Sequence, residues 1–463
     1  MEFKKNDIVQ VEIEDMGESG EGIGKTGGYT LFIKDAVIGD VVEAKIIKAK
    51  KHYAYGRPER VITPSPFRAA PKCSFHRQCG GCQIQALTYE KQIEYKQDKV
   101  RNNLIRIGGI APGLVDQLME APVGMEEPFY YRNKAQFPFG VDKEGKNITG
   151  FYAGRTHNII ANTDCALGAE ENQIILEKIL GYMEEEGVKA YEENKHQGLV
   201  RHALIRKGFS TGQLMVCLVI NGKELPHEER LISSLLEVPG MTSISLSVNR
   251  EKTNVIMGRE IRLLYGKEQI EDRIGGLTFL ISPLSFYQVN PVQTEKIYAQ
   301  ALEYAALTGK ETVWDLYCGI GTISLFLAKK AKQVYGVEII PEAIDDAKEN
   351  ARRNEIENVD FFVGRAEDIL PLKYREEGIY ADVIVVDPPR KGCDETCLAT
   401  MVRMKPERIV YVSCDSATLA RDVKYLGENG YELKRVRVFD NFPQSVHVES
   451  TVLLQKRDAD PVH

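Results

Sequence analysis

The chain has 463 residues, of which 43% are hydrophobic and 27% charged, and its formal net charge is −7; this composition is that of an ordinary globular protein, and the length predicts several domains. No segment approaches the ~20 apolar residues of a membrane-spanning helix, and the N-terminal residues lack the apolar core of a signal peptide, so we expect a cytoplasmic protein that does not enter a membrane. The mild acidity excludes a protein that is basic throughout, but it leaves room for a local basic surface.

The first region, residues 1–62, alternates short apolar strands with glycine-rich turns. Strands are predicted at residues 8–13, 30–33 and 41–47, a pattern typical of a small closed β-barrel. Its second half carries a basic stripe that is either a solvated edge of the barrel or a surface that binds phosphates. The stripe consists of Lys45, Lys48, Lys50, Lys51, Arg57 and Arg60.

The second region, residues 63–282, opens with several prolines and a group of cysteines. Disulfides do not persist in a reducing cytosol, so clustered thiols point to a metal or to catalysis. Four thiolates can hold either zinc or a [4Fe–4S] cluster, and the spacing is compatible with both. The four candidate ligands are Cys73, Cys79, Cys82 and Cys165.

Beyond these cysteines, the second region mixes strands with an amphipathic helix. Strands are predicted at residues 214–220 and 243–248, and the helix at 172–186. The sequence Tyr-Tyr-Arg132-Asn133-Lys134 places two cations and an amide beside two aromatic rings. Such a group suits single-stranded RNA, whose phosphates need cations and whose bases stack on rings, although packing inside the protein would use the same residues.

The third region, residues 283–463, alternates apolar strands with helices. Crossover helices between continuous apolar strands predict a Rossmann-like, doubly wound and mostly parallel sheet, so the whole chain is an α/β protein with a barrel and a mixed α+β central domain. Two further strands, at residues 431–440 and 446–454, predict a terminal hairpin. The parallel strands are expected at residues 312–315, 333–337, 359–363, 383–386 and 408–412.

The end of the first of these strands carries the features of a cofactor site. Residues 315–322 read DLYCGIGT, and the two glycines let the backbone turn sharply where a helix begins. Glu338 ends the second strand, where a carboxylate can accept hydrogen bonds from ribose hydroxyls, and Asp387 ends the fourth. A nicotinamide site would require a third glycine where this chain has Ser324. The combination therefore favours S-adenosylmethionine.

Cys414 ends the fifth strand, and Glu449 lies in the terminal hairpin. The carboxyl ends of parallel strands share one edge of a sheet, so Cys414 is expected to face the same crevice as Asp387. Cys414 is then either a buried thiol at a strand end or a nucleophile. Glu449 is either an exposed strand glutamate or a general base.

Five motifs, taken in chain order, resemble the RNA uracil-5-methyltransferase family, and the resemblance covers essentially the whole chain. It implies transfer of a methyl group from S-adenosylmethionine to carbon 5 of a uridine. Ser416 departs from a proline common in the family, and Thr322 departs from the asparagine of some members. The motifs are Ser285-Phe-Tyr-Gln-Val-Asn290, the 315–322 loop, Asp387-Pro-Pro-Arg390, Ser413-Cys-Asp-Ser416 and His447-Val-Glu449.

Family roles carried onto matching positions make Cys414 the nucleophile and Glu449 the base. A thiolate that adds to carbon 6 of uracil makes carbon 5 nucleophilic, and a base then removes the carbon 5 proton so that the thiolate can leave. Phe286 is a candidate for stacking on a base. The implied cofactor contacts are Gln288, Tyr317, Glu338, Asp387, Gly319 and Gly321.

The other two regions also resemble parts of that family. The barrel resembles the TRAM domain, an RNA-binding module, which favours phosphate binding by the basic stripe. The four-cysteine pattern is similar to the iron–sulfur site of the family's ribosomal branch, which implies a [4Fe–4S] cluster with a structural or RNA-positioning role. This layout favours 23S rRNA as substrate over tRNA, and the sequence shows no sign of an obligate protein partner.

Two other classes of protein are compatible with parts of the sequence. An iron–sulfur oxidoreductase using a nicotinamide would account for the glycine loop and the cysteine group, but not for Cys414 at its strand end. A non-catalytic RNA-binding factor would need only the barrel and its basic stripe. The methyltransferase is the interpretation that accounts for all of these features together.

Overall fold

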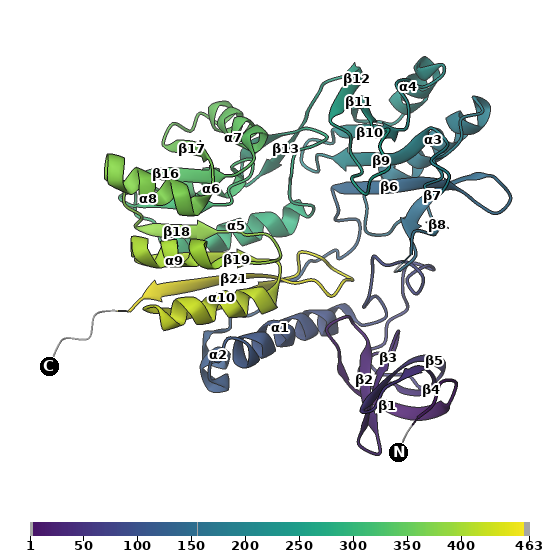
Figure 1. Cartoon of the computed structure of the whole chain (residues 1–463), viewed down its shortest axis with the longest axis horizontal. Coiled ribbons are helices and arrows are strands. Elements are labelled where there is room, and N and C mark those ends of the chain that lie inside the picture. The colour runs from purple at the N-terminus through teal and green to yellow at the C-terminus, as the bar shows by residue number, and fades with distance from the viewer. Residues whose placement is uncertain (1–2, 155, 458–463) are drawn as a thin grey trace.

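Three bodies make up the protein (Figure 1). The computed structural model describes residues 3–154 and 156–457. A barrel lies at the N-terminus, a seven-stranded sheet with helices forms the central body, and a second seven-stranded sheet with helices on both faces forms the C-terminal body. Within the described ranges, no helix combines the length and the apolar character that crossing a bilayer requires.

The N-terminal body confirms the predicted barrel, which closes in the order β1-β2-β3-β5-β4. Residues of β1 alternate between buried and exposed, because successive side chains of a strand point to opposite faces. Gly24 is required where two strands approach closely, since a Cβ there would lie 2.2 Å from the carbonyl oxygen of Glu12. The strands are β1 (Ile8–Met16), β2 (Gly22–Thr26), β3 (Tyr29–Ile33), β4 (Val41–Ala49) and β5 (Tyr53–Thr63).

Two helices, α1 (Tyr89–Arg106) and α2 (Pro112–Leu118), follow the barrel. Residues Val100 and Leu104 of α1 belong to the same apolar core as Trp314 of the C-terminal sheet. In Figure 1 both helices lie along that sheet. The sequence boundaries assign α1 and α2 to the central region, but the two helices pack as part of the C-terminal body.

The central body is a mixed sheet in the order β12-β11-β10-β9-β6-β7-β8. One face is apolar and is covered by α3 (Glu171–Glu185) and α4 (Glu228–Leu236). A two-stranded hairpin, β13 (Ile270–Ile274) and β14 (Leu277–Ile281), leads to the C-terminal body. The sheet strands are β6 (Lys134–Val141), β7 (Asn147–Tyr152), β8 (Ile159–Ala161), β9 (Val200–Lys207), β10 (Leu214–Ile220), β11 (Met241–Val248) and β12 (Glu260–Gly266).

The C-terminal body confirms the predicted doubly wound sheet, in the order β17-β16-β15-β18-β19-β21-β20. The first five strands are parallel, and the terminal hairpin joins antiparallel to β19. The strands are β15 (Thr312–Leu316), β16 (Gln333–Glu338), β17 (Val359–Val363), β18 (Val383–Val386), β19 (Arg408–Ser413), β20 (Tyr431–Phe439) and β21 (Glu449–Lys456). The helices are α5 (Pro291–Ala305), α6 (Thr322–Ala328), α7 (Pro341–Arg353), α8 (Ala366–Glu377), α9 (Glu395–Met404) and α10 (Ser416–Glu428).

The strand directions place the candidate residues at one edge of this sheet. Because β15, β16, β18 and β19 are parallel, their carboxyl ends bring Asp315, Glu338, Asp387 and Cys414 to the same edge. Strand β21 runs the opposite way, so its first residue, Glu449, lies at that edge too. The topology alone therefore assembles the predicted nucleophile, base and cofactor residues.

Candidate active site

The loop after β15 has three residues with positive φ: Tyr317 at 66°, Gly319 at 54° and Gly321 at 82°. Glycine adopts such angles without strain, whereas Tyr317 is held there by the surrounding structure. A Cβ at Gly321 would lie 2.9 Å from the ring of Phe361. Glycine is therefore required where the chain turns from β15 into α6.

A small cavity lies at this turn, at the carboxyl edge of the sheet. Four of the predicted cofactor contacts line it: Gln288, Tyr317, Gly319 and Asp387. Phe286 is also at the wall, with its side chain largely exposed at 70%. The remaining lining residues are Tyr287, Tyr298, Asp315, Cys318, Ile320, Thr322 and Ile323.

Glu338 and Gly321 do not line the cavity. One carboxylate oxygen of Glu338 accepts the N–H of Gly319 at 3.3 Å, and the other accepts the N–H groups of Ile339 and Ile340 at 2.8 and 3.1 Å. Both carboxylate oxygens accept hydrogen bonds from the backbone, so Glu338 stabilises the glycine turn through its bond to Gly319. Direct contact of Glu338 and Gly321 with a cofactor stays a prediction from the sequence.

Two buried carboxyl groups, Asp315 and Asp387, make the cavity acidic. Burial raises the pKa of each to about 7, because a buried carboxylate loses its hydration. Ser324 donates to one oxygen of Asp315, and the other oxygen has no partner among the described atoms. The Gln288 amide nitrogen lies 3.5 Å from Asp387. A positively charged cofactor that carries hydrogen-bond donors, such as S-adenosylmethionine, fits this surface.

Cys414 and Glu449 face the same crevice as Asp387. Burial raises the pKa of the Cys414 thiol to about 12; Glu449 and Asp387 add to the rise, and Arg390 opposes it. Glu449 is 4% exposed, and burial together with Asp387 raises its pKa well above that of an ordinary glutamate. The predicted base is therefore close enough to the predicted nucleophile to raise the pKa of its thiol.

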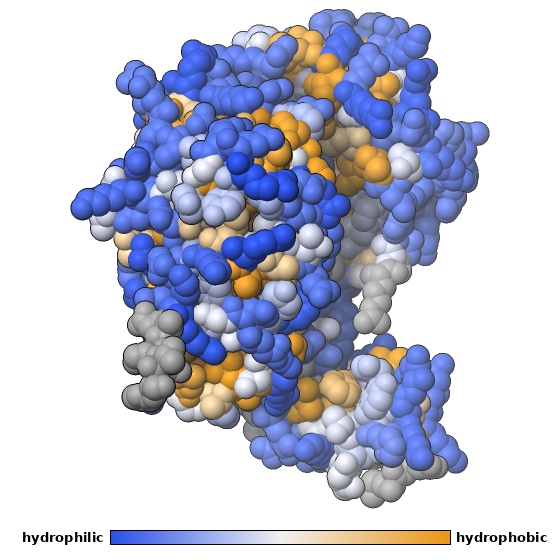
Figure 2. Space-filling view, turned by 60° about the vertical axis from the view of Figure 1, so that its left-hand side comes forward, coloured by the Kyte–Doolittle hydropathy of each residue, from blue (hydrophilic) through white to orange (hydrophobic). Residues whose placement is uncertain are grey.

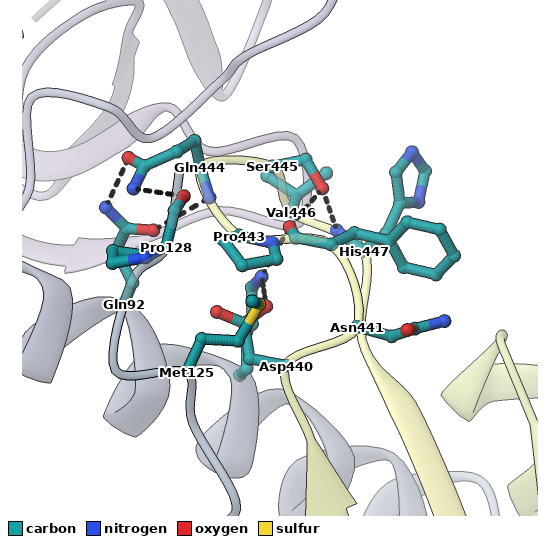
Figure 3. A network of polar contacts seen from close by, with 12 residues as sticks. Gln92, Met125, Pro128, Asp440, Asn441, Pro443, Gln444, Ser445, Val446 and His447 are labelled. Carbon is teal, nitrogen blue, oxygen red and sulfur yellow. Dashed lines mark hydrogen bonds and ion pairs between the residues drawn. The ribbon is translucent and has the colours of Figure 1, made fainter. Parts of the chain in front are cut away.

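The loop of residues 440–448 joins β20 to β21, which begins at Glu449; Figure 3 shows this loop and its polar contacts. Asn441, which is 1% exposed, stabilises the ionised carboxylate of Glu449 by a side-chain hydrogen bond. The backbone oxygen of Asn441 accepts from Asn290 at 3.1 Å. In Figure 3 the ring of His447 points away from the loop, while the amides of Gln92 and Gln444 face each other.

Helix α1 holds this loop from the other end of the sequence. Lys96 is 1% exposed; it forms an ion pair with Asp440 and donates to the carbonyl oxygen of Phe442 at 2.9 Å. Gln92 and Gln444 exchange two hydrogen bonds, of 2.9 and 3.0 Å. Sequence analysis did not identify these residues, because nothing distinguishes them from other polar residues of an amphipathic helix and a loop.

The predicted RNA contacts of the central body fall into two groups. The side chains of Arg132 and Lys134 are partly exposed. Asn133 is 3% exposed; its amide donates to the carbonyl oxygen of Gln288 at 2.8 Å, and its backbone N–H donates to that of Val289. The proposed RNA contact at Asn133 therefore needs correction, because this side chain is engaged inside the protein and supports the cofactor-lining segment.

The structure brings the four predicted metal ligands into one neighbourhood. Burial raises the pKa of Cys82 to about 12, and the nearby Cys165, Cys79 and Cys73 add to the rise. Within the described residues, however, no group of three or more histidine, cysteine or acidic side chains has an arrangement that could hold a metal ion. The predicted [4Fe–4S] cluster is therefore not confirmed by the side-chain geometry.

Comparison with known proteins agrees with the site. Residues 240–457 match the family model described as tRNA (Uracil-5-)-methyltransferase. An uncharacterized RNA methyltransferase of Halalkalibacterium halodurans is 50% identical over 455 residues, covering 98% of both chains. Another, from Clostridium tetani, is 49% identical and covers 97% of both chains. The chain belongs to the RNA uracil-5-methyltransferase family.

A solved structure supports the fold of this methyltransferase over its whole length. The tRNA (uracil-54, C5)-methyltransferase of Pyrococcus abyssi, solved in complex with S-adenosyl-L-homocysteine, superposes with a TM-score of 0.76 at 27% identity, covering 96% of this chain and all of that one. The family and the acidic cavity together support S-adenosylmethionine as the cofactor of this methyltransferase.

The barrel of the methyltransferase matches the TRAM domain over residues 2–58, and in Figure 2 it forms a lobe separated from the rest by a notch. Lys48, Lys50 and Lys51 are exposed, and Lys45 is half-buried. Beside them, the rings of Phe32, Tyr53 and Tyr55 lie 5.5 to 5.8 Å apart. Cations next to aromatic rings suit single-stranded RNA.

Proposed function

We propose that the protein methylates carbon 5 of a uridine in 23S rRNA, with Cys414 as the covalent nucleophile and Glu449 as the base. The observation that carries this proposal is the meeting of Cys414, Glu449 and Asp387 beside the cofactor cavity, where Glu449 and Asp387 raise the pKa of Cys414 and Asp387 raises that of Glu449. Three side chains from three separate segments converge where the two reactants would meet.

The chemistry requires each of these groups. S-adenosylmethionine, when bound, supplies the methyl group. The Cys414 sulfur adds to carbon 6 of the uracil ring, which makes carbon 5 nucleophilic. After carbon 5 is methylated, Glu449 removes the proton from that carbon, the Cys414–carbon 6 bond breaks, and the ring regains its double bond. The target uridine must be turned out of any helix to reach the thiol.

The electrostatics of the crevice suit this order of events. The thiol must ionise to attack, and Arg390 and a backbone hydrogen bond both lower the pKa of Cys414. A base that removes a proton from carbon needs a pKa above that of a free carboxylate, and burial gives Glu449 that property. Asn441 opposes part of this rise, so Glu449 can still ionise.

The substrate is proposed as 23S rRNA because the chain joins a TRAM barrel to the four-cysteine segment. The candidate alternative is tRNA, which the Pyrococcus abyssi relative modifies according to its name. Transfer of label from S-adenosylmethionine to unmodified 23S rRNA and to bulk tRNA, followed by nucleoside mass spectrometry, tests both. Label in 5-methyluridine of one RNA identifies the substrate, and absence of label in both contradicts the proposal.

We also propose that Cys73, Cys79, Cys82 and Cys165 are the ligands of a [4Fe–4S] cluster with a structural role. Support comes from the resemblance and from the mutual proximity of the four thiols; binding would require these side chains to turn toward a common centre. Iron, sulfide and zinc contents of protein purified without oxygen test the proposal. Four irons per chain, lost in Cys82→Ala, would support it, and zinc alone would contradict it.

A further inference from the structure

The central sheet holds two cations on neighbouring strands, and neither forms an ion pair with a carboxylate of the described residues. Lys134 in β6 and Arg206 in β9 are cross-strand partners, so their side chains stand on the same face. Like charges directly opposite one another destabilise an antiparallel pair. Burial, with Arg206 and Arg132 nearby, lowers the pKa of Lys134 to about 8, and burial lowers that of Arg206 to about 10.

Arg206 is buried, at 2% exposure, without an acidic partner. Its guanidinium donates to the carbonyl oxygens of Pro283 and Ser285, and its Nε has no partner among the described atoms. The next residue, Lys207, differs sharply because it pairs with Glu171 at 2.5 Å. A buried cation without a counter-ion is unfavourable unless a ligand supplies the missing negative charge.

The run of cations continues to the catalytic crevice. Burial lowers the pKa of His447 to about 4, and Arg390 and Arg132 lie close enough to contribute to this effect. Arg390 also lowers the pKa of Cys414. Within the described chain, neither arginine forms an ion pair with a carboxylate. Asn133, which lies between Arg132 and Lys134 in the chain, donates to the carbonyl oxygen of Gln288 in the cavity wall at 2.8 Å, so this end of β6 lies beside the crevice.

We propose that Arg206, Lys134, Arg132 and Arg390 form a cation track that binds the phosphodiester backbone of the RNA strand carrying the target uridine. Arg132 and Lys134, which are partly exposed, contact phosphates, and the buried Arg206 adds positive potential beneath them. The cofactor does not supply the missing anion, because none of the four residues lines its cavity. The cation track rests on the proposed function, because its ligand is the uridine-containing RNA; beyond that function, it specifies which residues the phosphodiester backbone of this RNA follows.

The test uses the full chain and a double variant, Arg132→Gln with Lys134→Gln. The probe is a short fluorescein-labelled oligouridylate, whose dissociation constant is measured by anisotropy over a range of salt concentrations. Each lost phosphate contact with a single strand lowers the slope of log K against log salt by about 0.7. The double variant should therefore lose about 1.4 from the slope and bind the probe more weakly at low salt.

A matched control is Lys207→Gln, which removes a neighbouring cation that already has a carboxylate partner and should leave the slope unchanged. An oligouridylate with uncharged methylphosphonate linkages should bind wild type and double variant equally, because it has no phosphate charge to lose. Thermal unfolding gives a second readout. Lys134→Gln relieves the repulsion by Arg206, so its melting temperature should match or exceed that of wild type, whereas a cation needed for folding would lower it.

An unchanged slope and dissociation constant in the double variant would overturn the cation track. So would an equal loss of affinity for the uncharged probe, because the lost contacts would then not be phosphate contacts. These measurements need no turnover. If the double variant binds more weakly but wild type forms no 5-methyluridine, the cation track is supported and the proposed reaction is rejected. If the double variant binds normally and wild type forms 5-methyluridine, the cation track alone is rejected.

Discussion

The catalytic crevice and the cation track carry buried charge of opposite sign: the crevice has an excess of acidic groups, and the track has an excess of basic groups. In the crevice, Asp315, Asp387 and Glu449 are buried carboxyl groups with raised pKa values. A short distance away, Lys134 and Arg206 are buried cations with lowered pKa values. Within the described residues, neither set has the oppositely charged partner that buried charges normally have.

This difference indicates which part of each reactant belongs where. A cationic cofactor relieves the acidic region, and a polyanionic backbone relieves the basic one. In the proposed reaction the uracil ring, which is neutral, lies between them, next to Cys414. At both places the buried charges reduce stability but favour binding of a reactant. The charges are acidic in the crevice and basic in the track.

The largest expected effect is a loss of methyl transfer without a loss of RNA binding, which distinguishes the role of the crevice from that of the cation track. Cys414→Ala removes the nucleophile, so methyl transfer should fall by at least about a thousandfold, the scale expected when a covalent nucleophile is lost. Oligouridylate affinity should remain that of wild type. Methyl transfer from labelled S-adenosylmethionine and fluorescence anisotropy measure the two properties. Turnover near wild type would remove Cys414 from the mechanism.

The second prediction stops the reaction inside the crevice. Glu449→Gln cannot accept the carbon 5 proton, so the elimination should stall and a covalent RNA–protein adduct should survive denaturing electrophoresis. The double variant Glu449→Gln with Cys414→Ala is the control and should give no adduct. If the single variant kept its activity and formed no adduct, the base would have to be another residue.

A smaller, several-fold effect measures the acidic imbalance itself. The Cys414 thiol has a pKa raised to about 12, so its thiolate fraction and its alkylation by iodoacetamide should rise tenfold per pH unit between pH 6 and 9. Glu449→Gln removes one of the negative charges that raise this pKa. Alkylation should therefore speed up, and more at high pH, where Glu449 would be ionised. Mass spectrometry of the Cys414 peptide reports the rate, and equal rates in both proteins would contradict the coupling.

The smallest expected effect is on RNA binding by the barrel, which belongs neither to the acidic crevice nor to the cation track. Replacing Lys50 and Lys51 by glutamine should weaken RNA binding by only about two- to threefold per residue, equally for all sequences, because exposed phosphate contacts carry no sequence information. Lys25→Gln is the control, since Lys25 is an exposed cation of β2 that lies outside the basic stripe. A change in which uridine is methylated would contradict this role.

The sequence predicted the crevice well because local signals were sufficient there. The end of each parallel strand can be read from the end of its apolar run, and a parallel sheet brings these ends together. Asp387 and Cys414 could therefore be placed at one edge without tertiary information. The glycine turn could be predicted equally well, since a positive φ favours glycine. Alternation of apolar residues predicted the barrel for the same reason, because period-two patterns depend on neighbours along the chain.

The parts that sequence missed depend on contacts between distant segments. Lys96 and Asp440 are 344 positions apart, and each looks like an ordinary surface charge in its own segment. Arg206 resembles any polar residue of an alternating strand until the register sets it against Lys134. Asn133 was placed on the RNA side because its neighbours are cations, but its side chain turns inward to the backbone of Gln288.

The ion pair between Lys96 and Asp440 also has a consequence for synthesis of the chain. Helix α1 leaves the ribosome early, yet the carboxylate that neutralises its buried lysine is translated near the end of the message. Until then the helix cannot close against the C-terminal body without burying a lone charge, which is strongly unfavourable. A chain that stops short of the last hairpin therefore lacks both the proposed catalytic base, Glu449, and the anchor of α1. Incomplete products should be open to proteases, and they should not persist as partly active enzyme.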